Sequence, residues 1–296
     1  MNRLRVADAL PAVTDLPVLL PAAARLARRA AAERAAGAPP LRLRAEHGGA
    51  LLLLFLVGCG IAQAQAGDGN PSILATIWKW TPLLARGFVF NLAISFVAMA
   101  VGTAVGLLLG FAQMSLLPPV KRSAWIVTHF FRNAPWLVLL FYCMFLLPFQ
   151  IRIFGITIPL PDWVKATLGL ALPVMANVSE ILRGAMQSIP TAQWESAASL
   201  AFSRRQTLWM IILPQCVKRM LPPWMNLYAI LTMATVLASI VGVNEMMTLT
   251  RQALSAENRP GLLLSFYSYV LLWFFVYCYP IARWTVRLEA RYAVNV

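Results

Sequence analysis

The longest polar stretch in the second half of the chain covers residues 193–215, with the sequence QWESAASLAFSRRQTLWMIILPQ. It offers no catalytic pair and no set of metal ligands. What it offers is an acid, Glu195, followed by small side chains, a combination that can form a docking surface for another protein. From the periodicity alone, a docking element and a connecting hairpin without a partner fit the stretch equally well.

Local signals divide this stretch into two helices. Apolar residues recur every three or four positions in residues 194–202, which indicates one apolar helix face. Ser203 and Gln206 have the spacing of a capping box, so a second helix should begin there. That helix should end at Leu213, because a residue before proline, here Pro214, is disfavoured in a helical conformation. The sequence therefore predicts two short helices joined by a turn.

A second group of polar residues lies within apolar stretches, where polar groups must face protein, water or lipid headgroups. For the pair at 132 and 133, the alternatives are snorkelling to the membrane interface and a place in a path for a polar solute. The hydroxyl groups further on could contact such a solute or bond to their own backbone. The candidates for this path are Arg132, Asn133, Asn177, Ser179, Thr232, Thr235 and Ser239.

Several chemistries have no signature in the sequence. No glycine-rich loop ends in Lys-Ser or Lys-Thr, so the chain is not expected to hydrolyse ATP itself. Paired carboxylates, a histidine-glutamate helix and a serine-histidine arrangement are also missing. The four cysteines are scattered without metal or redox spacing. We therefore expect no enzyme activity, no metal site and no bound cofactor in this chain.

The composition indicates a membrane protein. The chain is 60% hydrophobic and only 12% charged, whereas a soluble domain carries roughly twice that charged fraction. The net charge of +14 could suggest nucleic acid as a partner. However, the basic residues cluster at the ends of apolar stretches, where they determine membrane topology instead. We expect contact with membrane lipid and none with nucleic acid.

The apolar stretches predict an all-α, polytopic membrane bundle of about six transmembrane helices. Residues 1–47 are interpreted as a cytoplasmic tail rich in alanine and arginine, and residues 48–82 as a first transmembrane helix and an outer loop. Residues 83–292 would form a core of five helices. The expected spans are residues 50–66, 88–111, 125–147, 164–182, 224–243 and 262–281. The first span is short, and sequences similar to signal-peptidase and lipoprotein processing sites leave open whether it is retained.

The distribution of basic residues gives the orientation. Cytoplasmic loops carry an excess of lysine and arginine. With the amino terminus in the cytoplasm, few of the 25 such residues fall in outer loops, namely Lys79, Arg86, Arg152, Lys165, Arg251 and Arg259. This bias predicts a cytoplasmic amino terminus and places the polar stretch around Glu195 in the cytoplasm.

Several motifs occur in order between residues 83 and 292. They are Phe131-Arg132-Asn133-Ala134-Pro135, Ser179-Glu180-Ile181-Leu182-Arg183-Gly184, Gln187-Ser188-Ile189-Pro190, Glu195-Ser196-Ala197, Ile212-Leu213-Pro214 and Ala238-Ser239-Ile240-Val241-Gly242. Together they resemble the permease subunits of bacterial ABC importers, in the branch that takes up polar amino acids. The motif that begins at Glu195 resembles the EAA loop of that family.

The resemblance implies that residues 188–215 are the coupling loop, which in this family seats in a groove of a cytoplasmic ATPase. The residues implied to couple to the ATPase are Glu195, Ser196, Ala197, Ala198, Ala201, Phe202, Arg204, Gln206, Leu213 and Pro214. Two departures stand out. The family usually has glycine, which permits positive φ, where this chain has Ala201. A Lys-Asp pair of the following helix is replaced by Thr232-Met233.

The resemblance also implies the partners and the location. They are two copies of an ABC ATPase that hold ATP and Mg²⁺, a second permease subunit that is identical or paralogous, a periplasmic substrate-binding protein and a small polar amino acid. The expected location is the bacterial cytoplasmic (inner) membrane. The alternatives are a membrane anchor that binds an ATPase without transport, and a secondary transporter driven by an ion gradient. The scarcity of membrane-embedded acids disfavours the latter.

Overall fold

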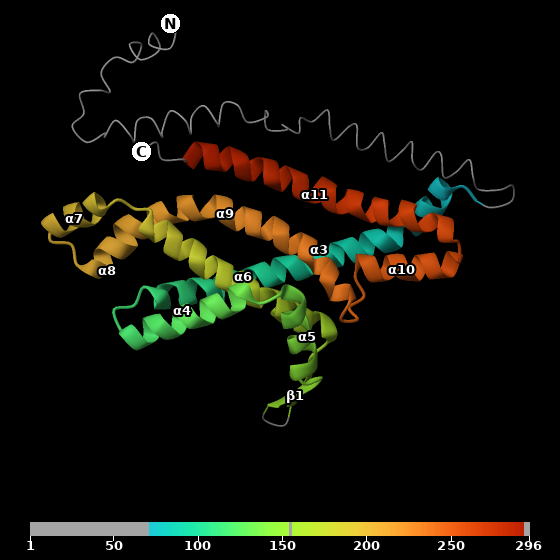
Figure 1. The fold of residues 1–296 in the computed structure, drawn as a ribbon, viewed down its shortest axis with the longest axis horizontal. Helices are drawn as coiled ribbons and strands as arrows, with labels where there is room; N and C mark the ends of the chain where they lie inside the picture. Colours follow the sequence, from blue (N-terminus) through green and yellow to red (C-terminus); the bar gives the residue numbers. More distant parts are fainter. Residues whose placement is uncertain (1–70, 154–155, 293–296) are drawn as a thin grey trace, which may run out of the picture. The chain divides into compact units, whose positions relative to one another are not determined.

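The computed structural model describes residues 71–153 and 156–292, most of which are helical (Figure 1). The predicted tail and the predicted first span lie outside the described residues. The α-helices are α3 (Ile73–Gln113), α4 (Pro118–Asn133), α5 (Trp136–Leu146), α6 (Asp162–Gln187), α7 (Thr191–Ser199), α8 (Arg204–Gln206), α9 (Leu213–Ala234), α10 (Met246–Glu257) and α11 (Leu263–Tyr292). A π-helix, η1 (Thr207–Ile212), and two 3-10 helices, η2 (Thr235–Ser239) and η3 (Pro260–Leu262), connect some of them.

The long helix α3 is the spine of the bundle. It begins after Ser72, whose hydroxyl accepts a hydrogen bond from the N–H of Ala75, and continues for 41 residues. The predicted division between an outer loop and a core at residue 83 therefore falls inside a continuous helix. Figure 1 shows α6, α9 and α11 running alongside it.

Glycines make the close contact between α3 and α6 possible. A Cβ on Gly102 would lie 2.5 Å from Val174, and one on Gly106 would lie 2.6 Å from the carbonyl oxygen of Met175. Both separations are shorter than real side chains allow. The four-residue spacing of these glycines gives α3 one flat stripe against α6, as expected for tight packing of membrane helices.

Length and composition support a membrane-spanning bundle. Within the described residues, Ile73–Gln113, Arg204–Ser239 and Pro260–Arg291 are each long and apolar enough to cross a membrane. The pair α4 and α5 would count as a fourth crossing if it forms one bent span. The all-α membrane architecture is confirmed, while the count of about six spans stays a prediction.

The predicted span over residues 125–147 is broken into two helices. α4 and α5 meet at an angle of 105°, and Figure 1 shows α5 leaving the bundle. The break falls at Ala134, which has an extended backbone with φ −74° and ψ 137°. The cause is Pro135, since its ring disfavours a helical conformation at the residue before it.

The expected outer loop after α5 contains a small antiparallel hairpin. Strand β1 (Gln150–Ile153) pairs with β2 (Ile156–Pro159), with Ile151 opposite Ile158. Beside it, Lys165 of α6 is fully buried, and its ammonium lies 3.6 Å from the ring centroid of Phe149. The hairpin is a local exception to the helical fold.

Candidate coupling loop and intramembrane polar residues

The helical hairpin α7–η1 projects from one end of the bundle and is anchored by apolar contacts. Ala197 of α7 is 2% exposed. Ile212 is fully buried in a cluster with Leu182 and Met186 of α6. The guanidinium of Arg219 also donates hydrogen bonds to Ser188, to its carbonyl oxygen at 2.6 Å and its hydroxyl at 2.8 Å. The hairpin base is thus fixed to both neighbouring helices.

The turn after α7 has the backbone that glycine would give. Ala201 has a φ of 57°. Its N–H donates to the carbonyl of Ala198 at 2.9 Å, and the N–H of Phe202 donates to the carbonyl of Ala197 at 3.1 Å. These two bonds form a Schellman motif, the usual satisfaction of a helix C-terminus. The replacement of glycine therefore preserves the turn, at a steric cost of about 1 kcal/mol.

The second helix of the hairpin starts as predicted. The Ser203 hydroxyl accepts from the N–H of Gln206 at 3.4 Å, and the Gln206 side-chain oxygen accepts from the N–H of Ser203 at 2.9 Å. The reciprocal bonds confirm the capping box. Because these partners are three residues apart, the turn is stabilised within the hairpin itself.

The predicted helix end at Leu213 is wrong. Leu213 is helical, with φ −58° and ψ −43°, and the chain passes from α8 through η1 into α9. Pro214 lies at the start of α9 and would clash with the carbonyl four residues before it in a regular α-helix. The π-helical turn over Thr207–Ile212 changes that spacing and lets the helix continue past the proline. π-Helical turns are frequent at functional sites.

Most of the implied coupling residues lie on the surface of the hairpin. Ala197 is the exception, because it is buried against the bundle and cannot touch a partner without rearrangement. Phe202 and Leu213 are half-buried. The exposed members are Glu195, Ser196, Ala198, Ala201, Arg204, Gln206 and Pro214. The hairpin thus presents an acid, small residues and a basic residue outward.

The hydroxyl residues considered for a solute path are buried. Thr232 donates to the carbonyl of Tyr228 at 2.9 Å, and Thr235 donates to that of Thr232 at 2.7 Å, so both bond to nearby backbone. Ser239 is 8% exposed. Ser179 accepts from the Gln113 amide of α3 at 2.6 Å and so links α3 to α6. In this conformation three of the four hydroxyls already have a hydrogen-bond partner within the chain.

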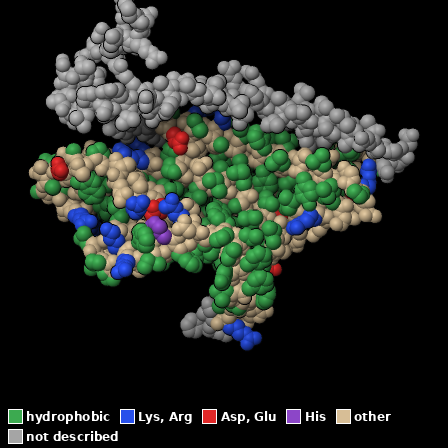
Figure 2. Space-filling view, viewed as in Figure 1, with side chains coloured by type: hydrophobic (Ala, Val, Ile, Leu, Met, Phe, Trp, Pro, Cys, Tyr) green, Lys and Arg blue, Asp and Glu red, His purple; other side chains and the backbone are tan. Residues whose placement is uncertain are grey.

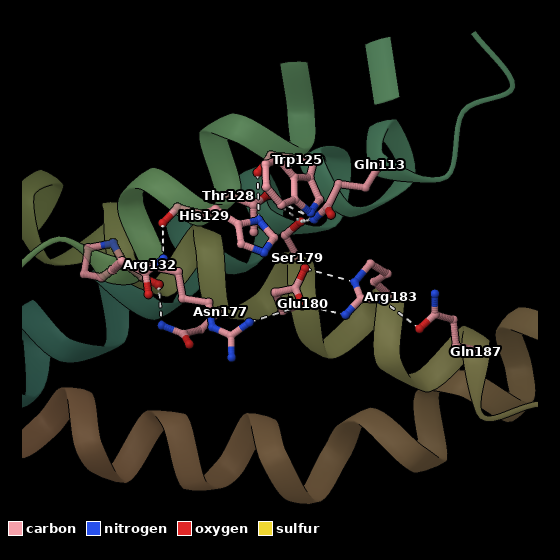
Figure 3. Close-up of polar contacts among 12 residues, drawn as sticks. Gln113, Trp125, Thr128, His129, Arg132, Asn177, Ser179, Glu180, Arg183 and Gln187 are labelled. Atoms are coloured by element: carbon pink, nitrogen blue, oxygen red, sulfur yellow. Dashed lines mark hydrogen bonds and ion pairs between the residues drawn. The ribbon is translucent and has the colours of Figure 1, made fainter. Parts of the chain in front are cut away.

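The charged candidates form a cluster between α4 and α6 (Figure 3). Arg183 donates to both carboxylate oxygens of Glu180, at 3.0 and 2.8 Å. Arg132 approaches the same carboxylate at 3.3 Å from the last turn of α4. Asn133 and Asn177 donate to backbone carbonyls of their own helices, at 2.7 and 2.8 Å. One carboxylate therefore links two arginines next to the break between α4 and α5.

A buried acid that the sequence motifs did not indicate lies directly before α10. Glu245 is fully buried and caps α10, accepting from the N–H of Met247 at 3.0 Å and of Thr248 at 2.9 Å. The Asn91 amide of α3 donates to it at 2.9 Å and to the hydroxyl of Thr235, also at 2.9 Å. Burial raises the pKa of Glu245, and these hydrogen bonds oppose that rise.

Comparison with known proteins agrees with this architecture. Residues 102–291 match the family described as binding-protein-dependent transport system inner membrane component. The chain is 34% identical over 212 residues to the probable amino-acid ABC transporter permease protein YckA of Bacillus subtilis, covering 72% of this chain and 90% of that protein. It is 32% identical over 185 residues to the glutamine transport system permease protein GlnP of Escherichia coli, covering 60% and 78%.

A solved structure titled as an amino acid ABC transporter with histidines has the same fold. The TM-score is 0.65 at 24% sequence identity, and the match covers 75% of this chain and 100% of that one. The bundle and its projecting hairpin define an ABC importer permease, a transport subunit of the inner membrane. The chain belongs to the binding-protein-dependent transport system inner membrane component family.

Proposed function

We propose that this chain carries a small polar amino acid across the bacterial cytoplasmic membrane, driven by ATP that a separate subunit hydrolyses. The relatives named as amino-acid and glutamine permeases support the substrate class. The observation that carries the proposal is the hairpin α7–η1. It is anchored at its base, and its exposed side carries Glu195.

The partners follow from family membership and from this surface. Two copies of an ATPase that hold ATP and Mg²⁺ would each bind the hairpin of one permease subunit. The two permease subunits are identical or paralogous. A periplasmic binding protein would deliver the amino acid at the opposite end. Closure of the ATPase pair would pull on the hairpins, and because α8, η1 and α9 are continuous, that pull reaches the bundle directly. Nucleotide and substrate then bias one two-state bundle from its two ends.

A path through the bundle is the second part of the proposal. The candidates that are not fully buried are Arg132, Asn133 and Asn177, near the break between α4 and α5. The buried hydroxyls Ser179, Thr232, Thr235 and Ser239 could reach such a path only after the helices separate. The amino terminus would lie in the cytoplasm, on the side of the hairpin.

The test is affinity purification of the tagged chain in mild detergent, followed by mass spectrometry. Recovery of an ABC ATPase is expected, and the permeases in the same complex decide between a homodimer and a heterodimer. Reconstituted with ATP and the binding protein, the complex should take up a labelled amino acid. Recovery of the chain alone, under conditions that preserve a control importer, would contradict the proposal.

A further inference from the structure

A cavity of about 630 Å³ lies between the end of α3, the start of α4 and the end of α6 (Figure 3). Its walls carry Lys121, Arg122 and His129 of α4 and Arg183 of α6. Trp125 adds an indole ring stacked on His129, with ring centroids 4.1 Å apart. Among the described residues, no aspartate or glutamate lines this cavity. The cavity is therefore basic.

Two of these cations are available to a ligand. Lys121 and Arg122 are exposed, and neither forms an ion pair with any residue of the described ranges. Arg183, in contrast, is already neutralised by Glu180 at 2.8 Å. Helix α4 begins at Pro118 without a side-chain cap, so the positive end of its dipole adds to the field of the two cations.

Buried hydrogen bonds hold the cavity walls in place. The Gln113 amide of α3 donates to the hydroxyl of Thr128 on α4 at 3.0 Å and to that of Ser179 on α6 at 2.6 Å. The two hydroxyls lie 3.3 Å apart, and all three side chains are buried. The three helices are thus fixed before a ligand arrives, which lowers the entropic cost of binding.

The helix that carries the two cations also exposes apolar side chains. Trp125 is 52% exposed, Ile126 53% and Phe130 64%, and the only residues that α4 buries are Ala124 and Thr128. Figure 2 shows hydrophobic side chains over much of the side in view, with lysine and arginine side chains in several separate places, one group of them in the region of α4. A ligand that combines an anionic group with hydrocarbon would match both surfaces.

We propose that this cavity binds an anionic phospholipid, with the phosphate at Lys121 and Arg122 and the acyl chains along α4. Lysine and arginine are the residues that bind phosphate, and basic pockets between transmembrane helices on the cytoplasmic side hold anionic headgroups. The assignment of this site to the cytoplasmic leaflet rests on the orientation in the proposed function. Lipid binding by the cavity does not depend on that orientation.

The test uses the purified full chain in neutral detergent, titrated with phosphatidylglycerol and followed by native mass spectrometry. The double variant Lys121→Gln with Arg122→Gln should bind phosphatidylglycerol about 30-fold more weakly than the unchanged chain. Each of the two cations contributes about fivefold to the affinity, and the two contributions multiply. The reciprocal exchange, Lys121→Arg with Arg122→Lys, should restore binding. Phosphatidylcholine should be retained by none of these proteins.

A control variant removes the same charge elsewhere. Arg86→Gln with Arg152→Gln should bind phosphatidylglycerol like the unchanged chain. Equal affinity of the Lys121/Arg122 variant and this control would overturn the proposal, and so would displacement of the lipid by millimolar inorganic phosphate, which would indicate a site for free anions. If the double variant elutes as an aggregate, Lys121→Gln alone, with an expected loss of about fivefold, decides the question without reference to transport.

Discussion

The turn after α7 and the turn before α10 have similar backbones, but different contacts hold them in place. The turn after α7 has a positive φ at Ala201, and the turn before α10 has one at Gly242, with φ 91°. In each, a polar side chain then caps the next helix. Ser203 is exposed and bonds to Gln206, three residues away. Glu245 is buried and bonds to Asn91, 154 positions away along the chain.

This difference distinguishes a turn that is free to contact a partner from a turn that is bonded into the packed bundle. The turn after α7 satisfies its polar groups locally, so its exposed side remains free to contact a partner. The turn before α10 is tied to α3 and to η2 through the Asn91 amide, so it cannot move without breaking buried bonds. We therefore expect changes in the turn after α7 to affect coupling, and changes in the turn before α10 to affect stability.

The largest expected loss of stability comes from Glu245→Ala. This variant removes the cap of α10 and leaves the buried amide of Asn91 without one acceptor. The free energy of unfolding should fall by roughly 3 kcal/mol, measured as thermal unfolding in detergent. The matched control is Glu195→Ala, which removes an exposed acid and should leave the unfolding temperature unchanged. A stable Glu245→Ala protein would abolish the distinction between the two turns.

Two glycine substitutions that lie outside both turns test how closely α3 packs against α6. Gly106→Ala places a methyl group 2.6 Å from the backbone oxygen of Met175 and should cost about 1–3 kcal/mol, because close-packed helices must separate. Gly184→Ala on α6 meets nothing within 4 Å and should stabilise the helix by up to about 1 kcal/mol. Thermal unfolding of both proteins, under one set of conditions, measures the difference. Equal effects would show that α3 and α6 are not packed as described.

Substitutions at the positive-φ positions of these two turns, Ala201 and Gly242, should change stability in opposite directions. Ala201→Gly removes the strain of a Cβ in the left-handed region and should stabilise the protein by less than about 1 kcal/mol, since glycine also loses more entropy on folding. Gly242→Ala should destabilise it by about 1 kcal/mol or more. Chemical denaturation of the two variants checks the signs. A destabilising Ala201→Gly would mean that the hairpin turn has another backbone.

The smallest expected effect is a pH dependence from the ion pair between Lys79 and Glu257. The Lys79 ammonium, 2.7 Å from Glu257, and the indole N–H of Trp80 hold the pKa of this carboxyl below its ordinary value. A lowered pKa in the folded state stabilises the protein at neutral pH, and the contribution is lost as the pH falls below about 4. For an exposed pair it is less than about 1 kcal/mol. Glu257→Gln should remove this contribution. The measurement compares the unfolding temperatures of the variant and the unchanged protein at pH 7 and at acid pH.

The parts of the fold that could be predicted are those encoded over a few residues. The capping box at Ser203 and the glycine stripe of α3 depend on fixed spacings that the sequence displays. Glu245 has no such local signal for its buried partner, because Asn91 meets it only once the bundle has folded. The same limit applies to Gln113, whose amide bridges α4 and α6.

The two prolines show why a local rule is not sufficient. A residue before proline is disfavoured in a helix, and this holds at Ala134, where α4 and α5 separate by 105°. It fails at Leu213, where the π-helical turn accommodates Pro214. The rule before proline applies equally at both positions, so the packing around each proline decides which helix breaks. The positions of the coupling residues were predictable to the level of the hairpin, and the burial of Ala197 agrees with the apolar face predicted over residues 194–202.

The most direct test of the hairpin as the coupling element is to measure assembly and stability together in Glu195→Lys. We expect this variant to insert into the membrane with an unchanged unfolding temperature. It should no longer retain the ATPase during purification and no longer take up labelled amino acid with ATP. Retention of the ATPase with normal uptake would contradict the assignment of this hairpin as the coupling element. A loss of both accompanied by unfolding would show that the hairpin is not the independent surface described here.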